Sequence, residues 1–243
     1  EYDIQPQETP MTAPVCVIPG AGPGNGAAFA RRFADSGYQV AMLARDGDRL
    51  AEIAGPIEGA NPYPCDVTDP ASVAGTIEAV RGDLGRVSVL LYNAGGGRWG
   101  TAEEVDSEDM EQAWRMNVLG LHAAARAVLP DMRAAGGGAM VVTGATASLR
   151  GGAHFAAFAS AKAAQRSLAQ SLGRHLSPEN IHVALVIIDG VVATPRTREM
   201  MPDRPEERFL SPDAIAESVH FLAHQPPSAW TFELDLRPYT EAW

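Results

Sequence analysis

Short runs of β-branched and other apolar residues alternate along this chain with longer alanine-rich segments. Apolar runs of this length are typical of buried strands and alanine favours helices, so the alternation predicts parallel strands joined by crossover helices. The predicted strands are residues 15–18, 39–43, 63–67, 87–91, 139–143, 181–188 and 231–236, and the predicted helices are residues 24–36, 70–81, 107–135, 156–176 and 211–223. The pattern therefore predicts an α/β fold, with a doubly wound parallel sheet of about seven strands.

Several single residues sharpen these boundaries. Asp69 and Pro70 form an N-cap followed by proline at the first helical position, and Pro64 places its strand at a sheet edge because proline cannot donate to a central ladder. Gly120 and Pro130 are expected to bend or break the long helix that contains them. Residues 1–14 are polar and proline-bearing and are expected to be a flexible leader or a cloning remnant, which leaves one domain over residues 15–243.

Composition excludes some classes of function. The net charge of −11 and the absence of lysine-arginine clusters argue against nucleic-acid binding, and no apolar stretch approaches the ~20 residues needed to span a bilayer. The only cysteines, Cys16 and Cys65, both fall in predicted strands and are expected to be buried free thiols, so a cytoplasmic location is predicted. His220 and His224 have a possible metal-ligand spacing but no recognisable third ligand, so no metal site is predicted.

A glycine-rich segment, Gly20-Ala21-Gly22-Pro23-Gly24-Asn25-Gly26, follows the first strand and opens the first helix. Glycines here let the backbone approach a pyrophosphate, whose charge then faces the helix N-terminus. The critical small residues are either Gly20, Gly24 and Gly26, or Gly22 and Gly24 with Ala27. Both registers predict a Rossmann-type dinucleotide site.

The end of the second strand bears on which dinucleotide binds. A guanidinium at this point clamps a 2′-phosphate, whereas a carboxylate binds the free 2′-hydroxyl and repels the phosphate. Arg45 comes first, so NADP is favoured, while Asp46 and Asp48 keep NAD open.

These features and four further matches resemble the short-chain dehydrogenase/reductase family over about residues 15–194. The matches are Cys65-Asp66-Val67, Tyr92-Asn93-Ala94-Gly95, Met116-Asn117-Val118 and Thr194. The resemblance implies that Asp66 contacts the adenine, Asn117 holds a water of the proton relay and Thr194 contacts the carboxamide. It also implies that Asn93, Ala94 and Gly95 line the cofactor site. The chain departs from the family pattern at Pro19, Tyr92 and Asp189.

The family's catalytic residues are a serine, a tyrosine and a lysine, and only the lysine carries over, as Lys162. The resemblance implies that Lys162 binds the nicotinamide ribose. Phe158 stands at the tyrosine position and Ala145 at the serine position. Carbonyl reduction places negative charge on oxygen and needs an aligned donor, which neither side chain supplies.

Other groups could supply the proton. His154 lies four residues before Phe158 and carries an imidazole, a common general acid, but an ordinary exposed loop histidine would fit the same position. Thr146 and Ser148 are hydroxyls beside the vacant serine position, although Ser148 could equally cap a turn. Further alternatives are Lys162 or Ser160 acting through a water on Asn117, and Asp189 on the pocket floor.

The sequence therefore predicts an NADP(H)-binding reductase with a non-standard proton-donor site, acting on a small carbonyl or conjugated enoyl substrate. The alternatives are a non-redox cofactor-binding protein, such as a sensor, scaffold or inactive subunit, and an isomerase or lyase reusing the same pocket. The resemblance further implies a homodimer or homotetramer assembled through the helices that contain Asn117 and Lys162.

Overall fold

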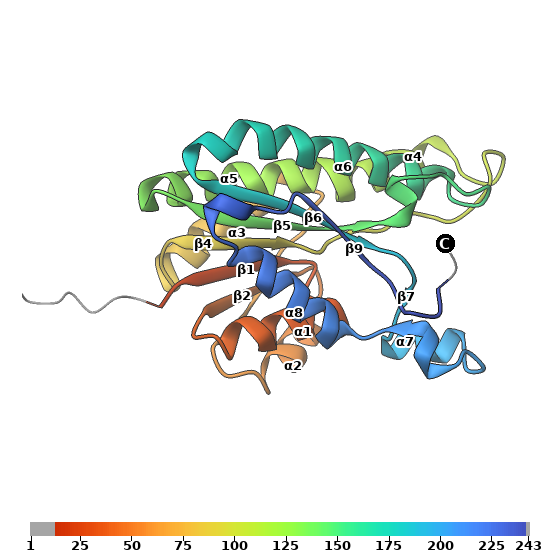
Figure 1. Ribbon diagram of the computed structural model, residues 1–243, viewed down its shortest axis with the longest axis horizontal. Coiled ribbons are helices and arrows are strands. Elements are labelled where there is room, and N and C mark those ends of the chain that lie inside the picture. The colour runs from red at the N-terminus through yellow and green to blue at the C-terminus, as the bar shows by residue number, and fades with distance from the viewer. Residues whose placement is uncertain (1–12, 242–243) are drawn as a thin grey trace, which may run out of the picture.

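The computed structural model describes residues 13–241. Its main sheet has seven parallel strands in the order β3-β2-β1-β4-β5-β6-β9 (Figure 1). The strands are β1 (Val15–Pro19), β2 (Gln39–Ala44), β3 (Ala60–Pro64), β4 (Val87–Tyr92), β5 (Gly138–Ala145), β6 (Ile181–Ile188) and β9 (Glu233–Leu236). The predicted doubly wound sheet in a single α/β domain is confirmed. Most of the predicted leader, residues 1–12, lies outside the described residues.

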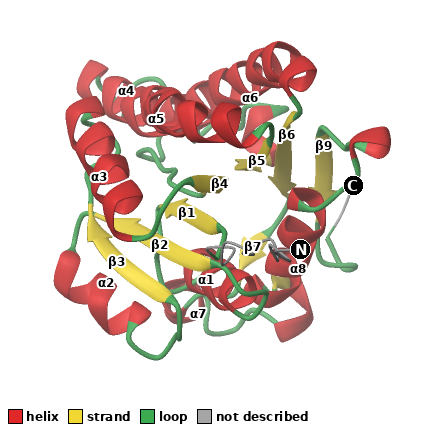
Figure 2. Ribbon diagram, turned by 90° about the vertical axis from the view of Figure 1, so that its left-hand side faces the viewer, coloured by secondary structure: helices red, strands yellow, loops and turns green. Residues whose placement is uncertain are grey.

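Helices cover both faces of the sheet (Figure 2). One layer contains α3 (Pro70–Asp83), α5 (Gly120–Ala135) and α6 (Ala156–Leu176), and the other contains α1 (Asn25–Ala34), α2 (Gly47–Ala54) and α8 (Pro212–Ala223). Alternate strand residues enter opposite cores, so Val15 and Val17 pack in one hydrophobic cluster, and Cys16 and Ile18 in the other. Both cysteines are buried and free, as predicted.

The remaining elements are short. They are α4 (Ser107–Trp114), the π-helix η1 (Arg115–Leu119), α7 (Pro195–Met200), a two-stranded sheet of β7 (Val191–Val192) and β8 (Phe209–Leu210), and 3-10 turns at residues 146–148, 177–179, 206–208 and 227–229. Within residues 13–241, no helix combines the length and apolar character that crossing a bilayer requires.

The chain runs from β1 outward through β2 to β3, and then returns to place β4 on the other side of β1. Connections therefore leave the carboxyl ends of β1 and β4 in opposite directions, which opens a crevice at this point of the sheet. The glycine-rich segment after β1 and the segment after β4 both border this crevice.

Most boundaries differ from the prediction by two residues or fewer, and the larger differences are few. β3 begins and ends three residues earlier than predicted, although it lies at the sheet edge as Pro64 indicated. The predicted helix 107–135 is divided at Gly120, where the π-helix η1 passes into α5, whereas Pro130 lies inside α5 without ending it. The short α2 and α7 were not predicted. Each begins at a residue whose side chain caps the helix, Asp46 for α2 and Thr194 for α7. A capping residue of this kind can be recognised in the sequence even when the helix that follows is short.

Candidate active site

The glycine-rich segment is packed so closely that side chains would not fit at three positions. A Cβ on Gly20 would lie 2.4 Å from the amide nitrogen of Ala94, and Gly20 has a φ of +86°. A Cβ on Gly24 would lie 2.6 Å from Cγ2 of Thr194, and one on Gly26 2.5 Å from Cα of Ala21. Gly22, by contrast, borders open space. Packing therefore requires the register of Gly20, Gly24 and Gly26.

The segment borders a cleft of about 640 Å³. The first turn of α1 holds no acidic residue and no side chain caps its amides. The Ala27 amide donates to the Gly22 carbonyl, while those of Asn25 and Gly26 have no acceptor within residues 13–241, which leaves them for an anion. Asn93 fixes the loop by donating from Nδ2 to the Gly20 carbonyl at 2.8 Å. Asn25 lines the same cleft, and its Oδ1 atom is buried without a partner within residues 13–241. A buried acceptor without a donor is costly unless a ligand supplies one, so this cleft fits a nucleotide.

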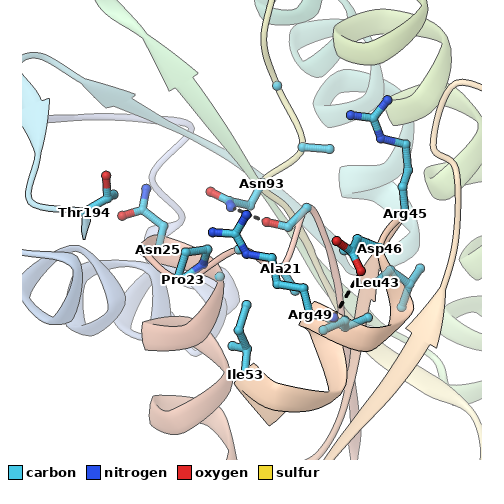
Figure 3. Close-up of a pocket in the computed structure, with 18 of the residues that line it drawn as sticks. Ala21, Pro23, Asn25, Leu43, Arg45, Asp46, Arg49, Ile53, Asn93 and Thr194 are labelled. Atoms are coloured by element: carbon cyan, nitrogen blue, oxygen red, sulfur yellow. Dashed lines mark hydrogen bonds between the residues drawn. The ribbon is translucent and has the colours of Figure 1, made fainter. Parts of the chain in front are cut away.

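Basic side chains follow β2 and line the same cleft (Figure 3). Arg45 and Arg49 line it, and neither guanidinium forms a hydrogen bond or ion pair within residues 13–241. The carboxylate of Asp46 instead caps α2 by accepting from the Arg49 amide at 3.1 Å. Asp66 accepts hydrogen bonds from the amide and the hydroxyl of Thr68. The hydrogen bond from the amide is the main reason that the pKa of the Asp66 carboxyl is lowered. Its neighbours Cys65 and Val67 line the cleft.

A second pocket, of about 570 Å³, continues from the first. The two share Asn25, Asn93, Gly95 and Val192 in their linings. Its wall includes three aromatic rings in edge contact, with centroid distances of 5.3 Å for Trp99–Phe155 and 6.5 Å for Phe155–Phe158. Ala145 and Phe158 both line it and neither carries a hydroxyl. The result is a largely apolar chamber joined to the nucleotide cleft.

Lys162 is the polar group of most consequence in the second pocket. Of the 19 lysine and arginine residues in this chain, it is the only lysine. The side chain is 5% exposed, and Nζ donates to the Thr143 carbonyl and to Oε1 of Gln165, both at 2.9 Å. Burial lowers the pKa of its amine to about 7. Lys162 is thus a cation that can give up a proton near neutral pH, which arginine cannot do.

Asn117 lies beside Lys162 in the π-helix η1. Its Nδ2 donates to the carbonyls of Gly96 at 2.6 Å and Ala113 at 2.8 Å, while Oδ1 is buried without a partner within residues 13–241. A Cβ on Gly95 would lie 2.8 Å from Nζ of Lys162 and 3.1 Å from Oδ1 of Asn117. Only a glycine fits here, and Gly95, which lines both cavities, thus lies directly against both polar groups.

A family model described as short chain dehydrogenase matches residues 14–205. This chain belongs to the short-chain dehydrogenase family. A curated relative, the 3-oxoacyl-[acyl-carrier-protein] reductase of Homo sapiens, is 28% identical over 218 residues, which cover 87% of this chain and 92% of the relative. A short-chain dehydrogenase structure from Rhodopseudomonas palustris is 34% identical with a TM-score of 0.80, covering 93% of this chain and 98% of that one. The structure of an alcohol dehydrogenase from Thermococcus sibiricus, complexed with 5-hydroxy-NADP, is 30% identical with a TM-score of 0.83. The match covers 94% of this chain and 98% of that one.

Within this short-chain dehydrogenase, three of the predicted proton donors lie away from the pocket lining. The His154 side chain is 71% exposed, and its Nδ1 lies 3.8 Å from a carboxylate oxygen of Glu104 rather than among the lining residues. Ser148 is buried and donates to the Ala145 carbonyl at 2.7 Å, as a turn-capping serine does. Ser160 donates to the Ala156 carbonyl at 2.8 Å, one turn back along α6. None of these hydroxyl or imidazole groups is brought to Lys162.

Thr146 does line the pocket, but its hydroxyl proton is already used. It donates to Oδ1 of Asp189 at 2.6 Å, and the other oxygen of Asp189 lies 3.3 Å from the Arg237 guanidinium. Thr146 can therefore accept a hydrogen bond from a ligand more readily than it can donate one. Thr194, also predicted from the sequence, lines the nucleotide cleft and caps α7 by accepting from the Thr197 amide.

Sequence reasoning missed Arg49, Asn25 and Gln165. Arg45 precedes the N-cap of α2 and Arg49 lies in its first turn, so the start of this helix brings two cations to the lining of one cleft. Gln165 follows Lys162 by three residues on α6, at a position where the neighbouring pattern calls for an apolar side chain. An amide inside an apolar stripe was the available signal. His220 and His224 stack on each other at 4.0 Å, and residues 13–241 hold no group of three potential metal ligands.

Proposed function

We propose that this short-chain dehydrogenase binds NADP(H) and reduces a small carbonyl or conjugated enoyl compound, with Lys162 as the proton donor. One observation carries the proposal: the only lysine of the chain lines the second pocket, close to the residues that the pocket shares with the nucleotide cleft. Placing an ionisable amine there gives the apolar pocket an acid at the position where reduction needs one.

Basic side chains support NADP over NAD. Arg45, Arg49 and Arg196 line the cleft and form no ion pair within residues 13–241, whereas the one carboxylate among the lining residues described, on Asp46, is engaged in capping α2. A 2′-phosphate adds negative charge that two guanidinium groups bind well, and a capped carboxylate is a poor partner for a ribose hydroxyl. NADPH would be held between the glycine-rich segment and these arginines, and would supply the hydride.

Phe158 and Ala145 take, in this proposal, the family positions of the tyrosine and the serine. A phenyl ring and a methyl group neither donate a hydrogen bond to a developing oxyanion nor protonate it. The ammonium of Lys162 does both, because two of its protons are held by Thr143 and Gln165 and the third has no acceptor within residues 13–241. Its pKa of about 7 keeps a substantial ammonium fraction at neutral pH.

Conjugated enoyl compounds fit this arrangement better than simple ketones. Reduction of a conjugated alkene spreads the developing charge over an enolate, so a single cation near its oxygen provides stabilisation without a second hydroxyl donor. The aromatic wall formed by Trp99, Phe155 and Phe158 provides apolar surface for the carbon chain or ring.

The experiment has two steps. Calorimetric titration with NADPH and with NADH tests the cofactor first. Oxidation of NADPH is then followed by its absorbance with matched pairs of saturated ketones and conjugated enones. We expect tighter binding of NADPH and turnover that favours enones. Binding of NADPH without turnover of any member of either series would favour the non-redox alternative, a cofactor-binding sensor, scaffold or inactive subunit.

A further inference from the structure

Gln165 is a fully buried amide whose two ends both contact the catalytic region. It is 0% exposed and lies on α6, three residues after Lys162. Its Oε1 accepts from Nζ of Lys162 at 2.9 Å, and its Nε2 donates to the main-chain carbonyl of Asn117 at 3.0 Å. The amide thus links the lysine directly to the main chain of the π-helix η1.

The neighbouring carbonyl of the same π-helix is also occupied by a side chain. Tyr92, buried in β4, donates from its hydroxyl to the Met116 carbonyl at 2.5 Å. A π-helix turns main-chain carbonyls away from the regular i to i+4 pattern and leaves them for other donors. Here Met116 and Asn117 both receive a donor from the protein. Both of these main-chain carbonyls of the π-helix are therefore occupied by side-chain donors from other elements.

An amide in this position differs from water or a hydroxyl because it does not pass protons along. A glutamine side chain donates hydrogen bonds but gives up no proton near neutral pH, whereas a water molecule in a chain passes protons along. Thr143 of β5, Asn117 of η1, and Phe158 and Gln165 of α6 face the ammonium, and none of them ionises. No acidic side chain forms an ion pair with Lys162 within residues 13–241. The side of the Lys162 ammonium that these groups leave open faces the second pocket.

We propose that Gln165 is a positioning residue that fixes the Lys162 ammonium through Oε1 and closes the path from Nζ into the π-helix. Lys162 then exchanges its proton only through the substrate pocket. The effect on the lysine is independent of turnover, and only its catalytic consequence rests on the proposed function. A carbonyl acceptor at 2.9 Å stabilises the charged amine, so Gln165 holds the ammonium in its charged form against the effect of burial.

The single lysine permits a direct test. Protein grown with lysine carrying ¹³C at Cε has one labelled side chain, so the chemical shift of one methylene resonance reports the titration of Lys162 without any substrate. We would compare the unchanged chain with Gln165→Leu and Gln165→Glu. Gln170→Leu is the matched control, because it makes the same change on the same helix but lines a different cavity.

The expected midpoint of the unchanged chain is about 7. Gln165→Leu is expected to lower it by about one pH unit, a tenfold change in the protonation constant, and Gln165→Glu to raise it, because a carboxylate favours the ammonium. Gln170→Leu should leave it unchanged. Midpoints of the two Gln165 variants that equal that of the unchanged chain would overturn the proposal. If Gln165→Leu does not fold, Gln165→Met and Gln165→Glu carry the comparison.

Turnover separates this inference from the proposed function. If the pH profile of NADPH oxidation shifts with the measured midpoints, Gln165 acts through the catalytic acid. If the midpoints shift as expected while the pH profile of the rate does not, Gln165 still positions Lys162, and the assignment of Lys162 as the acid fails. If both the midpoints and the pH profile are insensitive to Gln165, the amide only fills space.

Discussion

The hydroxyl of Tyr92 lies against the bare Cα of Gly120. A Cβ at position 120 would be 2.2 Å from the Tyr92 oxygen, and this oxygen is held in place by its hydrogen bond to the Met116 carbonyl. Tyr92 is 0% exposed, so the phenol cannot swing into solvent. Gly120 therefore has a packing role at the point where the π-helix passes into α5, and not only the helix-breaking role that its residue type suggests.

Gly120→Ala is expected to destabilise the fold by about 2–3 kcal/mol, because overpacking a rigid interior forces side chains or backbone to move. Tyr92→Phe alone should cost about 1–3 kcal/mol, since it leaves the Met116 carbonyl without its donor. The double variant should be less unstable than the two losses combined, because removing the hydroxyl relieves the shorter of two close contacts, the other being 2.7 Å to the Val67 carbonyl oxygen. Urea unfolding of the four proteins measures this coupling. Strict additivity would mean that the contact is not what excludes a side chain.

Asp131 is a buried carboxylate that joins α5 to α3 and to the start of β4. It accepts from Nε of Arg81 at 2.8 Å and from the amide of Val87 at 3.3 Å, and its side chain is 6% exposed. Asp131→Ala should reduce the free energy of unfolding by about 2–3 kcal/mol, because a guanidinium and an amide lose their partner.

Arg133→Ala is the comparison for Asp131→Ala. Arg133 lies on the same helix as Asp131 and pairs with Glu179 of the 3-10 turn at residues 177–179, and its side chain is 47% exposed. That pair should contribute less than about 1 kcal/mol. Thermal or urea unfolding of both variants tests the contrast, and equal losses would contradict it.

Arg45 and Arg49 are predicted to distinguish the two nicotinamide cofactors. Substituting each by alanine should weaken NADPH binding about tenfold or more, which corresponds to about 1.4 kcal/mol, and leave NADH binding nearly unchanged. Calorimetry of both variants with both cofactors measures the difference. Equal weakening for NADPH and NADH would mean that the arginines contact a part that the two cofactors share.

Burial of Lys162 predicts a pH dependence of stability. Its pKa is about 7 in the folded chain and ~10.4 in an unfolded one, so between these values the unfolded chain binds more protons. The free energy of unfolding contributed by this group therefore rises with pH across that window, by up to about 1.4 kcal/mol per pH unit. Relative to Lys162→Met, the unchanged chain should gain stability between about pH 7 and pH 9. Parallel stability curves for the two proteins would show that the amine titrates normally.

The family resemblance implies self-association, and we propose that it uses an exposed apolar surface that can be tested. Met110, Trp114 and Leu119 are 40%, 45% and 38% exposed along α4 and η1, next to α6. Trp114→Glu should shift light-scattering mass toward the monomer, because a charge cannot be buried in an apolar contact without a partner. An unchanged mass that still exceeds one chain would place the contact elsewhere.

Much of the architecture could be predicted because each element carries its own local signal. The apolar runs gave all seven strands, and Asp69 with Pro70 marked the start of α3. The prediction for β3 was displaced by three residues because Pro62 and Pro64 obscure its pattern, and only pairing with β2 defines its ends. The π-helix carries no local signal at all, because Tyr92 and Gln165, far away in sequence, occupy its carbonyls.

The site divides in the same way. The cofactor residues follow from a motif whose geometry is local, and the packing of Gly20, Gly24 and Gly26 selects between the two registers that the sequence left open. The proton donor depends on which side chains turn inward. Sequence spacing placed His154 near Phe158, but its side chain points to solvent beside Glu104. The role of Gln165 depends on contacts with two other elements, so spacing alone indicates only that it shares a helix face with Lys162.

The rate of NADPH oxidation by Lys162→Arg, measured against an enone that the unchanged chain reduces, tests the central claim most directly. Arginine keeps the positive charge but gives up no proton near neutral pH. We predict that the variant still binds NADPH and loses at least about a hundredfold in rate, in line with the usual contribution of a general acid, while the rate of the unchanged chain falls as pH rises through about 7. Turnover by Lys162→Arg at the rate of the unchanged chain would contradict the account, because the proton would then come from another group.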